Sequence, residues 1–148
     1  MSLTDGTIRS WPLAGEWHVH PESRHRVRAG DGIRIGDGVG IGDEVTFGDG
    51  ITVGDDVRIG DGVSIGHGAT VGRCVYLTAG AQLGAGVTIG EDARIGRDAR
   101  IGDGTVLGAG VVIGDEARVG CGVEIAAGAT LPDRAIIRDG ALIAGAAQ

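Results

Sequence analysis

His67 is the only histidine between residues 29 and 143, and it is the side chain of this stretch best suited to proton transfer. Imidazole accepts and releases a proton readily near neutral pH, which is the task of a general base. Such a base is usually oriented by a carboxylate. Asp49 stands eighteen residues before His67, so the elements that carry the two residues decide whether they can act together.

Those elements belong to a repeat of six residues. Every sixth residue from Ile35 to Ile143 is large and apolar. We call these nineteen residues the key positions. A second residue, usually smaller and apolar, stands two places earlier each time, with Thr105 the only polar member, and Gly follows fourteen of the nineteen key residues. A fixed short period of this kind predicts a solenoid.

The spacing also predicts the shape of each unit. Residues two apart point to the same side of a strand, so both apolar positions face inward. The next two residues, often Asp-Gly or Ala-Gly, must turn a corner, because Gly adopts positive φ freely and Asp tolerates it. We therefore expect a strand of about four residues and a two-residue corner in each hexad.

The unit Ile59-Gly60-Asp61-Gly62-Val63-Ser64 resembles those of the hexapeptide-repeat proteins. This resemblance implies an all-β fold, a left-handed parallel β-helix in which three hexads form one triangular coil of eighteen residues. Residues 29 to 143 would then form about six coils. Asp49 and His67 would share one corner on adjacent coils, about 5 Å apart by strand spacing.

The sequence around His67, from Val63 to Gly72, resembles the catalytic-histidine hexad of the hexapeptide acyltransferases and acetyltransferases. The resemblance implies transfer of an acyl group from a CoA-type thioester to an amine or hydroxyl of a small molecule or sugar. His67 would be the base and Asp49 would hold its ring. The site would lie between the subunits of a homotrimer, and no metal is expected.

A belt without Asp or Glu runs from Gly62 to Gly90 in an otherwise acidic chain. We expect it to receive acyl-CoA or acetyl-CoA, with Arg73, Tyr76 and Thr78 as the contacts. An uncharged belt is also typical of the centre of a subunit interface. Outside the belt, we expect Arg94, Arg100 and Arg118, at outward strand positions, to pair with acids on the corners.

Other interpretations remain open. His67 can be a polar corner residue in the place that Asp49 and Asp103 take elsewhere, in a non-catalytic structural, assembly or binding module. A gamma-class carbonic anhydrase needs three histidines around a metal, and the repeat contains only His67. Corner carboxylates stacked eighteen apart, such as Asp31 and Asp49, either share Ca²⁺ or serve the turn geometry.

The composition and net charge of the chain disfavour some classes of binding partner. The chain of 148 residues has a net charge of −7 and no Lys, which argues against a nucleic-acid or anionic-membrane partner. No signal peptide is recognisable, and the run from Cys74 to Gly90 is too short and polar to span a bilayer. Cys74 and Cys121 are more than two coils apart, too distant to form a disulfide. We expect a cytoplasmic protein.

Residues 1–28 lie outside the repeat, and residues 29–148 form the β-helix domain. A solenoid needs a cap at its open end, which Trp11 and Trp17 are suited to provide. The alternative for this segment is a metal site from His18, His20 and His25. Four outward aliphatic residues late in the chain suggest a partner surface: Val106, Val112, Ile136 and Leu142.

Overall fold

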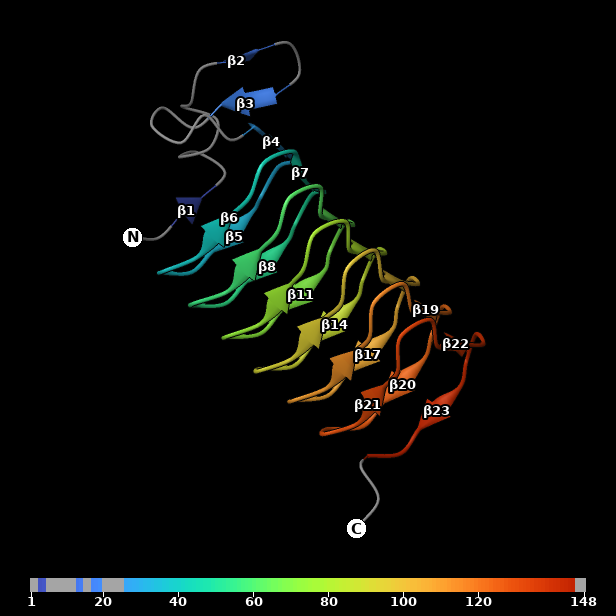
Figure 1. Ribbon diagram of the computed structural model, residues 1–148. Helices are drawn as coiled ribbons and strands as arrows, with labels where there is room; N and C mark the ends of the chain where they lie inside the picture. The colour runs from blue at the N-terminus through green and yellow to red at the C-terminus, as the bar shows by residue number, and fades with distance from the viewer. Residues whose placement is uncertain (1–2, 5–12, 15–16, 20–25, 146–148) are drawn as a thin grey trace.

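The computed structural model describes residues 3–4, 13–14, 17–19 and 26–145, and these ranges contain strands but no helix (Figure 1). Three sheets run along the molecule. Sheet A contains β1 (Leu3–Thr4), β5 (Arg34–Ile35), β8 (Thr52–Val53), β11 (Thr70–Val71), β14 (Thr88–Ile89), β17 (Val106–Leu107), β20 (Glu124–Ile125) and β23 (Leu142–Ile143). Sheet B contains β2 (Leu13–Ala14), β3 (Trp17–Val19), β4 (Arg26–Ala29), β7 (Val45–Phe47), β10 (Ser64–Ile65), β13 (Gln82–Leu83), β16 (Arg100–Ile101), β19 (Arg118–Val119) and β22 (Ile136–Ile137). Sheet C contains β6 (Gly40–Ile41), β9 (Arg58–Ile59), β12 (Tyr76–Leu77), β15 (Arg94–Ile95), β18 (Val112–Ile113) and β21 (Thr130–Leu131).

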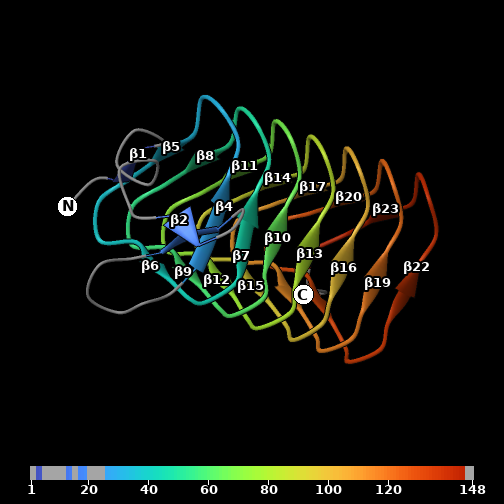
Figure 2. The ribbon, with the colours of Figure 1, turned by 90° about the horizontal axis from the view of Figure 1, so that it is seen from above.

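The chain visits the three sheets in turn, so from β4 to β20 each strand pairs with the third strand after it. Val71 of β11, for example, is in parallel register with Ile89 of β14 and with Val53 of β8. The row β7, β10, β13, β16, β19 and β22 is seen side by side in Figure 2. This register confirms the eighteen-residue coil and the parallel β-solenoid of about six coils, since sheet C has six strands, one for each coil.

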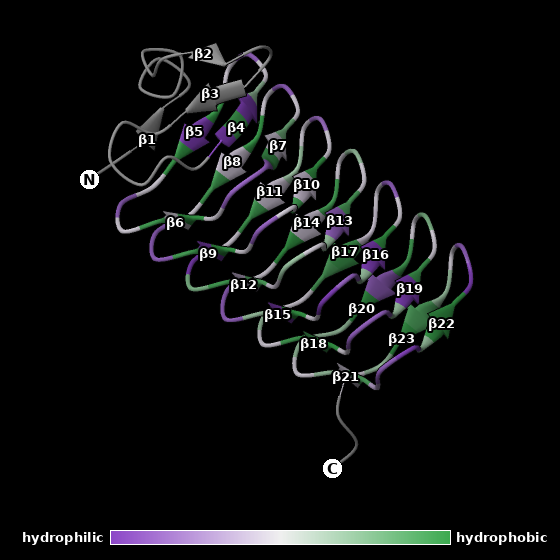
Figure 3. Ribbon diagram, turned by 45° about the horizontal axis from the view of Figure 1, so that its top comes forward, coloured by the Kyte–Doolittle hydropathy of each residue, from purple (hydrophilic) through white to green (hydrophobic). Residues whose placement is uncertain are grey.

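The core is a column of aliphatic side chains. The key residues from Ile59 to Leu131 are all buried, as are the smaller residues two places before them. Partial burial is confined to the first and last coils, where Ile41, Ile137 and Ile143 have fewer neighbours. Each fully buried aliphatic side chain contributes about 1.5–3 kcal/mol, so the column is the main source of stability. Figure 3 shows the resulting alternation of hydrophobic and hydrophilic residues along the coils.

Most strands have two residues rather than the four expected. The hydrogen bonds between coils nevertheless extend beyond them. The N–H of Gly66, just after β10, donates to the carbonyl of Leu83 at 2.8 Å, and the N–H of Ser64 donates to Ala81 at 3.0 Å. The strands are short because the corner follows within three residues, although the backbone is bonded to the next coil almost throughout.

Thr105 is the single buried polar side chain among the residues whose burial is described. Its hydroxyl donates to the carbonyl of Gly120 at 2.7 Å and accepts the N–H of Val123 at 3.3 Å. Thr105 thus satisfies two backbone groups of the next coil, which explains how a polar residue fits a position otherwise filled by small apolar ones.

The first strands join the solenoid in a different direction. β1 is antiparallel to β5, and β3 is antiparallel to β4, whereas β4 is parallel to β7 from Val27 onward. Trp11, His20 and His25 lie outside the described residues, and the side chains of Trp17 and His18 are not described either. The capping role and the metal site expected for this segment therefore stay predictions.

The outward aliphatic residues do not form one surface. Val106 and Leu142 lie on sheet A with Glu124 in register between them, whereas Val112 lies on sheet C and Ile136 on sheet B. Ile136 and Leu142 are each 76% exposed. A partner that binds one flat face of the solenoid therefore contacts the outward aliphatic residues of one sheet alone.

Candidate active site

His67 lies at the corner between β10 of sheet B and β11 of sheet A. The corner is tight because Gly68 adopts φ +69°, a left-handed conformation that suits glycine. On the preceding coil, a Cβ added to Gly48 would lie 2.7 Å from the backbone N of His67 and 2.9 Å from its Nδ1. The two coils therefore approach closely here, and this holds the imidazole ring against the backbone of the Asp49 corner.

His67 and Asp49 do come together, as expected for residues eighteen apart. The backbone N–H of Asp49 donates to Nδ1 of His67 at 2.8 Å. The carboxylate is further away, with Oδ2 at 3.7 Å from the same nitrogen. Both side chains are open to solvent, at 72% and 61% exposure. Because Nδ1 accepts a hydrogen bond, the neutral ring carries its proton on Nε2.

The same hydrogen bond recurs along the corners, made by Asp instead of His. Asp49 Oδ1 accepts the N–H of Asp31 at 2.7 Å, and Asp103 Oδ1 accepts that of Ala85 at 2.9 Å, both in the column of corners that contains His67. The other members of this set are Asp55, Asp61, Asp115, Asp133 and Asp139. Nδ1 of His67 thus occupies the place of a carboxylate oxygen, and His67 performs the structural task of a corner aspartate.

The residues expected to contact the thioester lie elsewhere. Arg73 is on the next corner, between sheets A and C, and Tyr76 and Thr78 are exposed on and just after β12 of sheet C. Tyr76 and Thr78 line a depression of about 410 Å³ together with Arg94, whose guanidinium carbon is 5.8 Å from the centre of the Tyr76 ring. His67 stands on the edge where sheets B and A meet, so one chain does not bring it together with Tyr76.

The expectation that Arg94, Arg100 and Arg118 pair with corner acids is wrong for the part of the chain that the structure describes. Arg26 instead pairs with Asp43 and Glu44, and Arg134 pairs with Glu116 at 3.9 Å. Arg26 and Arg134 reach corner acids from the start of a strand or from a corner. Arg94, Arg100 and Arg118 stand between the two inward residues of their hexads, so they point outward from a flat face of the solenoid rather than from a corner.

Two further expectations concern metals and disulfides. Within the described ranges, no group of three or more His, Cys, Asp or Glu side chains is placed to hold a metal ion. Corner carboxylates such as Asp49 and Asp61 instead accept backbone N–H groups. Cys74 and Cys121 are free and exposed, as the distance between their coils predicts. The described residues also include no helix long and apolar enough to cross a bilayer.

The coil, its period and its glycine corners define a hexapeptide-repeat parallel β-solenoid. A family model described as the GMPPB C-terminal domain matches residues 18–119, and the chain belongs to this family. No curated protein sequence matches the chain significantly.

Solved structures of the same fold include enzymes. A variant of GDP-perosamine N-acetyl transferase from Caulobacter crescentus, in complex with CoA and GDP-perosamine, is 26% identical over 82% of this chain and 52% of its own, with a TM-score of 0.66. The acetyltransferase domain of PglB from Neisseria gonorrhoeae, in complex with acetyl coenzyme A, is 26% identical over 80% of this chain and 54% of its own, with a TM-score of 0.57. A UDP-N-acetylglucosamine acyltransferase from Bacteroides fragilis, at 19% identity over 88% of this chain and 66% of its own and a TM-score of 0.51, shares the fold. The chain spans about half the length of the two acetyltransferases.

Proposed function

We propose that this protein transfers an acyl group from a CoA-type thioester, such as acetyl-CoA, to an amine or hydroxyl of a small molecule or sugar. The observation that carries the proposal is the presence of an exposed histidine beside a carboxylate, in a chain similar over 82% of its length to an acetyltransferase in complex with CoA. This similarity supports the reaction class and leaves the acceptor open.

His67 acts as the base in this proposal, and a base needs a nitrogen lone pair that faces the acceptor. With Nδ1 accepting the N–H of Asp49, Nε2 carries the proton and cannot accept another. The reactive form needs the proton on Nδ1 and a lone pair on Nε2. A small turn of the ring would let Nδ1–H donate to Asp49 Oδ2, now 3.7 Å away, so Asp49 is proposed as the positioning residue.

The proposed thioester contacts make a second subunit necessary. Arg73, Tyr76 and Thr78 would bind the CoA moiety, because the Tyr76 ring offers a stacking surface and Arg73 a positive charge. These residues lie on or beside sheet C, away from the edge that carries His67. A homotrimer with parallel axes would place the His67 edge of one subunit against sheet C of its neighbour, which is the arrangement we propose.

The test is a calorimetric titration with acetyl-CoA and longer acyl-CoAs at millimolar ligand, together with thermal shifts. Wild type is compared with Tyr76→Ala and with His67→Ala. We expect wild type and His67→Ala to bind the thioester and Tyr76→Ala to bind it more weakly. Failure of wild type to bind any thioester would refute the proposal.

A second function is favoured by one observation. Because His67 makes the hydrogen bond that aspartate makes at the other corners, its presence is explained without catalysis. The chain would then be a non-catalytic binding or assembly module, in keeping with a family whose model describes a C-terminal domain. Absence of thioester binding with retention of self-association would support this alternative.

A further inference from the structure

Two arginines lie in direct register on the outer face of sheet B. Arg100 of β16 pairs with Arg118 of β19 in the parallel ladder, so their side chains leave the sheet on the same side at adjacent strands. Like charges in this position repel each other and destabilise a sheet. The pair therefore needs a physical explanation, which an acid partner within the chain would normally provide.

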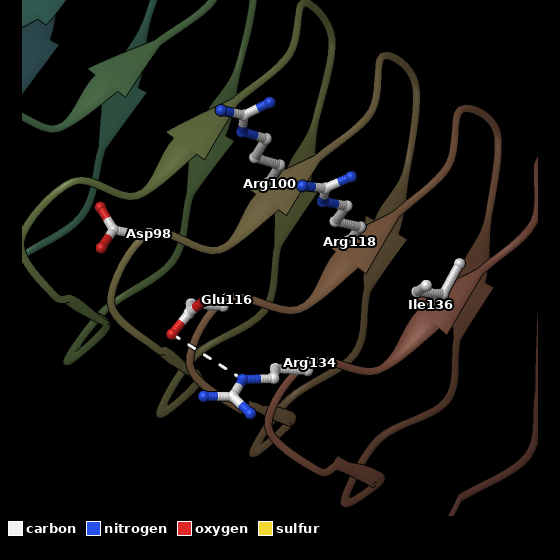
Figure 4. A pocket seen from close by; sticks show the side chains of 6 residues that line it. All are labelled: Asp98, Arg100, Glu116, Arg118, Arg134 and Ile136. Carbon is white, nitrogen blue, oxygen red and sulfur yellow. Dashed lines mark ion pairs between the residues drawn. The ribbon is translucent and has the colours of Figure 1, made fainter.

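The described part of the chain offers no such partner. Asp98 and Glu116 line the same depression, but no ion pair joins them to Arg100 or Arg118. Figure 4 shows the two guanidinium groups side by side and directed away from these acids, whereas Arg134 turns to Glu116. The contrast with Arg134 indicates that acids near the pair are not sufficient to neutralise it.

The surface around the pair is hollowed. Arg100 and Arg118 line an open depression of about 340 Å³ with Ile136 at its far side. Arg100 also borders a second depression of about 450 Å³, where Gln82 and Ser64 stand on the next two strands. Gln82 is in register with Arg100, and Ser64 with Gln82. Two guanidinium groups are thus followed along one face by an amide and a hydroxyl.

We propose that this face binds the phosphate group of a small phosphorylated molecule, with Arg100 and Arg118 as the anion contacts. A guanidinium group presents paired N–H donors that match phosphate oxygens, and two of them suit a doubly charged phosphate. Gln82 and Ser64 supply hydrogen bonds for the part of the molecule attached to the phosphate. Asp98 and Glu116 at the rim limit the positive potential, which favours a compact ligand over a long polyanion such as RNA. The site shares no residue with the proposed acyl-transfer site and does not depend on it.

The experiment is a calorimetric titration of the full chain with inorganic phosphate, pyrophosphate and glucose 1-phosphate at low salt. The variants are Arg100→Gln, Arg118→Gln and the double variant. Arg34→Gln is the matched control, because Arg34 is also an outward strand arginine but has Thr52, not a second arginine, in register on β8. Circular dichroism checks that each variant keeps the fold.

We expect saturable binding to wild type and to Arg34→Gln, weakened roughly tenfold or more by each single substitution at the pair. Tighter binding of glucose 1-phosphate than of inorganic phosphate would assign the site to an organic phosphate, and the reverse to the free ion. Equal affinity of wild type and the double variant would overturn the proposal, as would equal weakening by Arg34→Gln. If no probe binds and the double variant changes the molecular mass in light scattering, the arginines serve a subunit contact instead, and the phosphate site is refuted.

Discussion

The Nδ1 atom of His67 accepts the backbone N–H of Asp49 across adjacent coils, at 2.8 Å. In the same column, an aspartate oxygen makes the equivalent bond one coil before His67, at Asp49, and two coils after it, at Asp103. One residue therefore combines a structural bond, which any corner aspartate could make, with an imidazole Nε2 that no aspartate could provide. These two roles can be separated by substitution.

His67→Asp should preserve stability and abolish the proposed activity. Asp restores the corner hydrogen bond through Oδ1, so the free energy of unfolding should change by less than that of His67→Ala, which loses the bond. A hydrogen bond contributes about 0.5–1.5 kcal/mol, toward the lower end at this exposed corner. Removal of a general base should lower turnover roughly 10²–10⁴-fold in both variants. Denaturant unfolding and a thioester-consumption assay measure the two effects.

Asp49→Asn is the companion substitution. It keeps the backbone N–H that holds Nδ1 but removes the charge that would stabilise the protonated ring. We expect a smaller loss of turnover than for His67→Ala and little change in unfolding. Full activity of His67→Asp would show that His67 is only a corner residue.

The proposed division of the site between subunits predicts complementation. His67→Asp and Tyr76→Ala should each be inactive or weakened alone, because each homotrimer lacks one group at every interface. Co-expression should restore activity to about a third of wild type in mixed trimers, because one of the three interfaces of each mixed trimer keeps both groups. The measurement uses two affinity tags to isolate mixed oligomers. No recovery in mixed oligomers that still bind acetyl-CoA would rule out a shared site.

Sheet A is the face best suited to self-association. Its outward residues Thr52, Thr70, Thr88 and Val106 form an uncharged strip over four coils, with Val106 42% exposed. Val106→Asp should shift the mass in light scattering from trimer toward monomer, because burying an unpaired charge costs several kcal/mol. Ile136→Asp, on the sheet that carries the arginine pair, is the control and should leave the mass unchanged. A monomeric wild type at micromolar concentration would refute the trimer.

A glycine of the repeat should be replaceable only where no neighbouring coil packs against it. A Cβ at Gly102 would lie 2.5 Å from the carbonyl carbon of Gly120, so Gly102→Ala must push two backbones apart and should destabilise by about 1–3 kcal/mol or more. At Gly40 the nearest atom is Nη1 of Arg58 at 3.9 Å, and Gly40→Ala should be tolerated. Thermal unfolding of the two variants compares a required with a replaceable glycine, and equal losses would contradict this explanation.

Thr105→Val keeps the shape of the side chain but leaves the carbonyl of Gly120 and the N–H of Val123 without their hydroxyl partner. An unsatisfied buried group costs about 1–3 kcal/mol, so we expect a loss of stability of this order. Thr88→Val, on the exposed face of β14, should be nearly neutral. Denaturant midpoints measured together would show whether the loss is specific to the buried hydroxyl.

The hexad period predicts the inward residues. The resemblance to hexapeptide-repeat proteins adds the coil of eighteen residues, and with it the meeting of His67 with Asp49, because a parallel ladder of that period leaves no freedom in register. The same count indicates that His67, on a corner, and Tyr76, nine residues later on a strand, lie on different sides of one chain. The period does not specify which hydrogen-bond or ion-pair partner a side chain contacts once its backbone position is set. Whether Nδ1 meets the backbone or the carboxylate of Asp49, and whether Arg100 reaches an acid, depends on side-chain torsions that the repeat leaves open.

Because the ladder is uninterrupted, residues eighteen apart lie on the same face of the solenoid. The position of a residue within its coil of eighteen therefore decides which face carries it. Deleting one hexad between Gln82 and Arg100 would keep every key residue inward, yet it would turn all later residues onto the neighbouring face, and Arg100 would leave the sheet that carries Gln82. Deleting a whole coil would restore the faces and shorten the molecule by one strand spacing, about 4.8 Å. A chain of this kind can gain or lose length in whole coils while its surfaces keep their composition, whereas a single misplaced hexad exchanges one surface for another without disturbing the core.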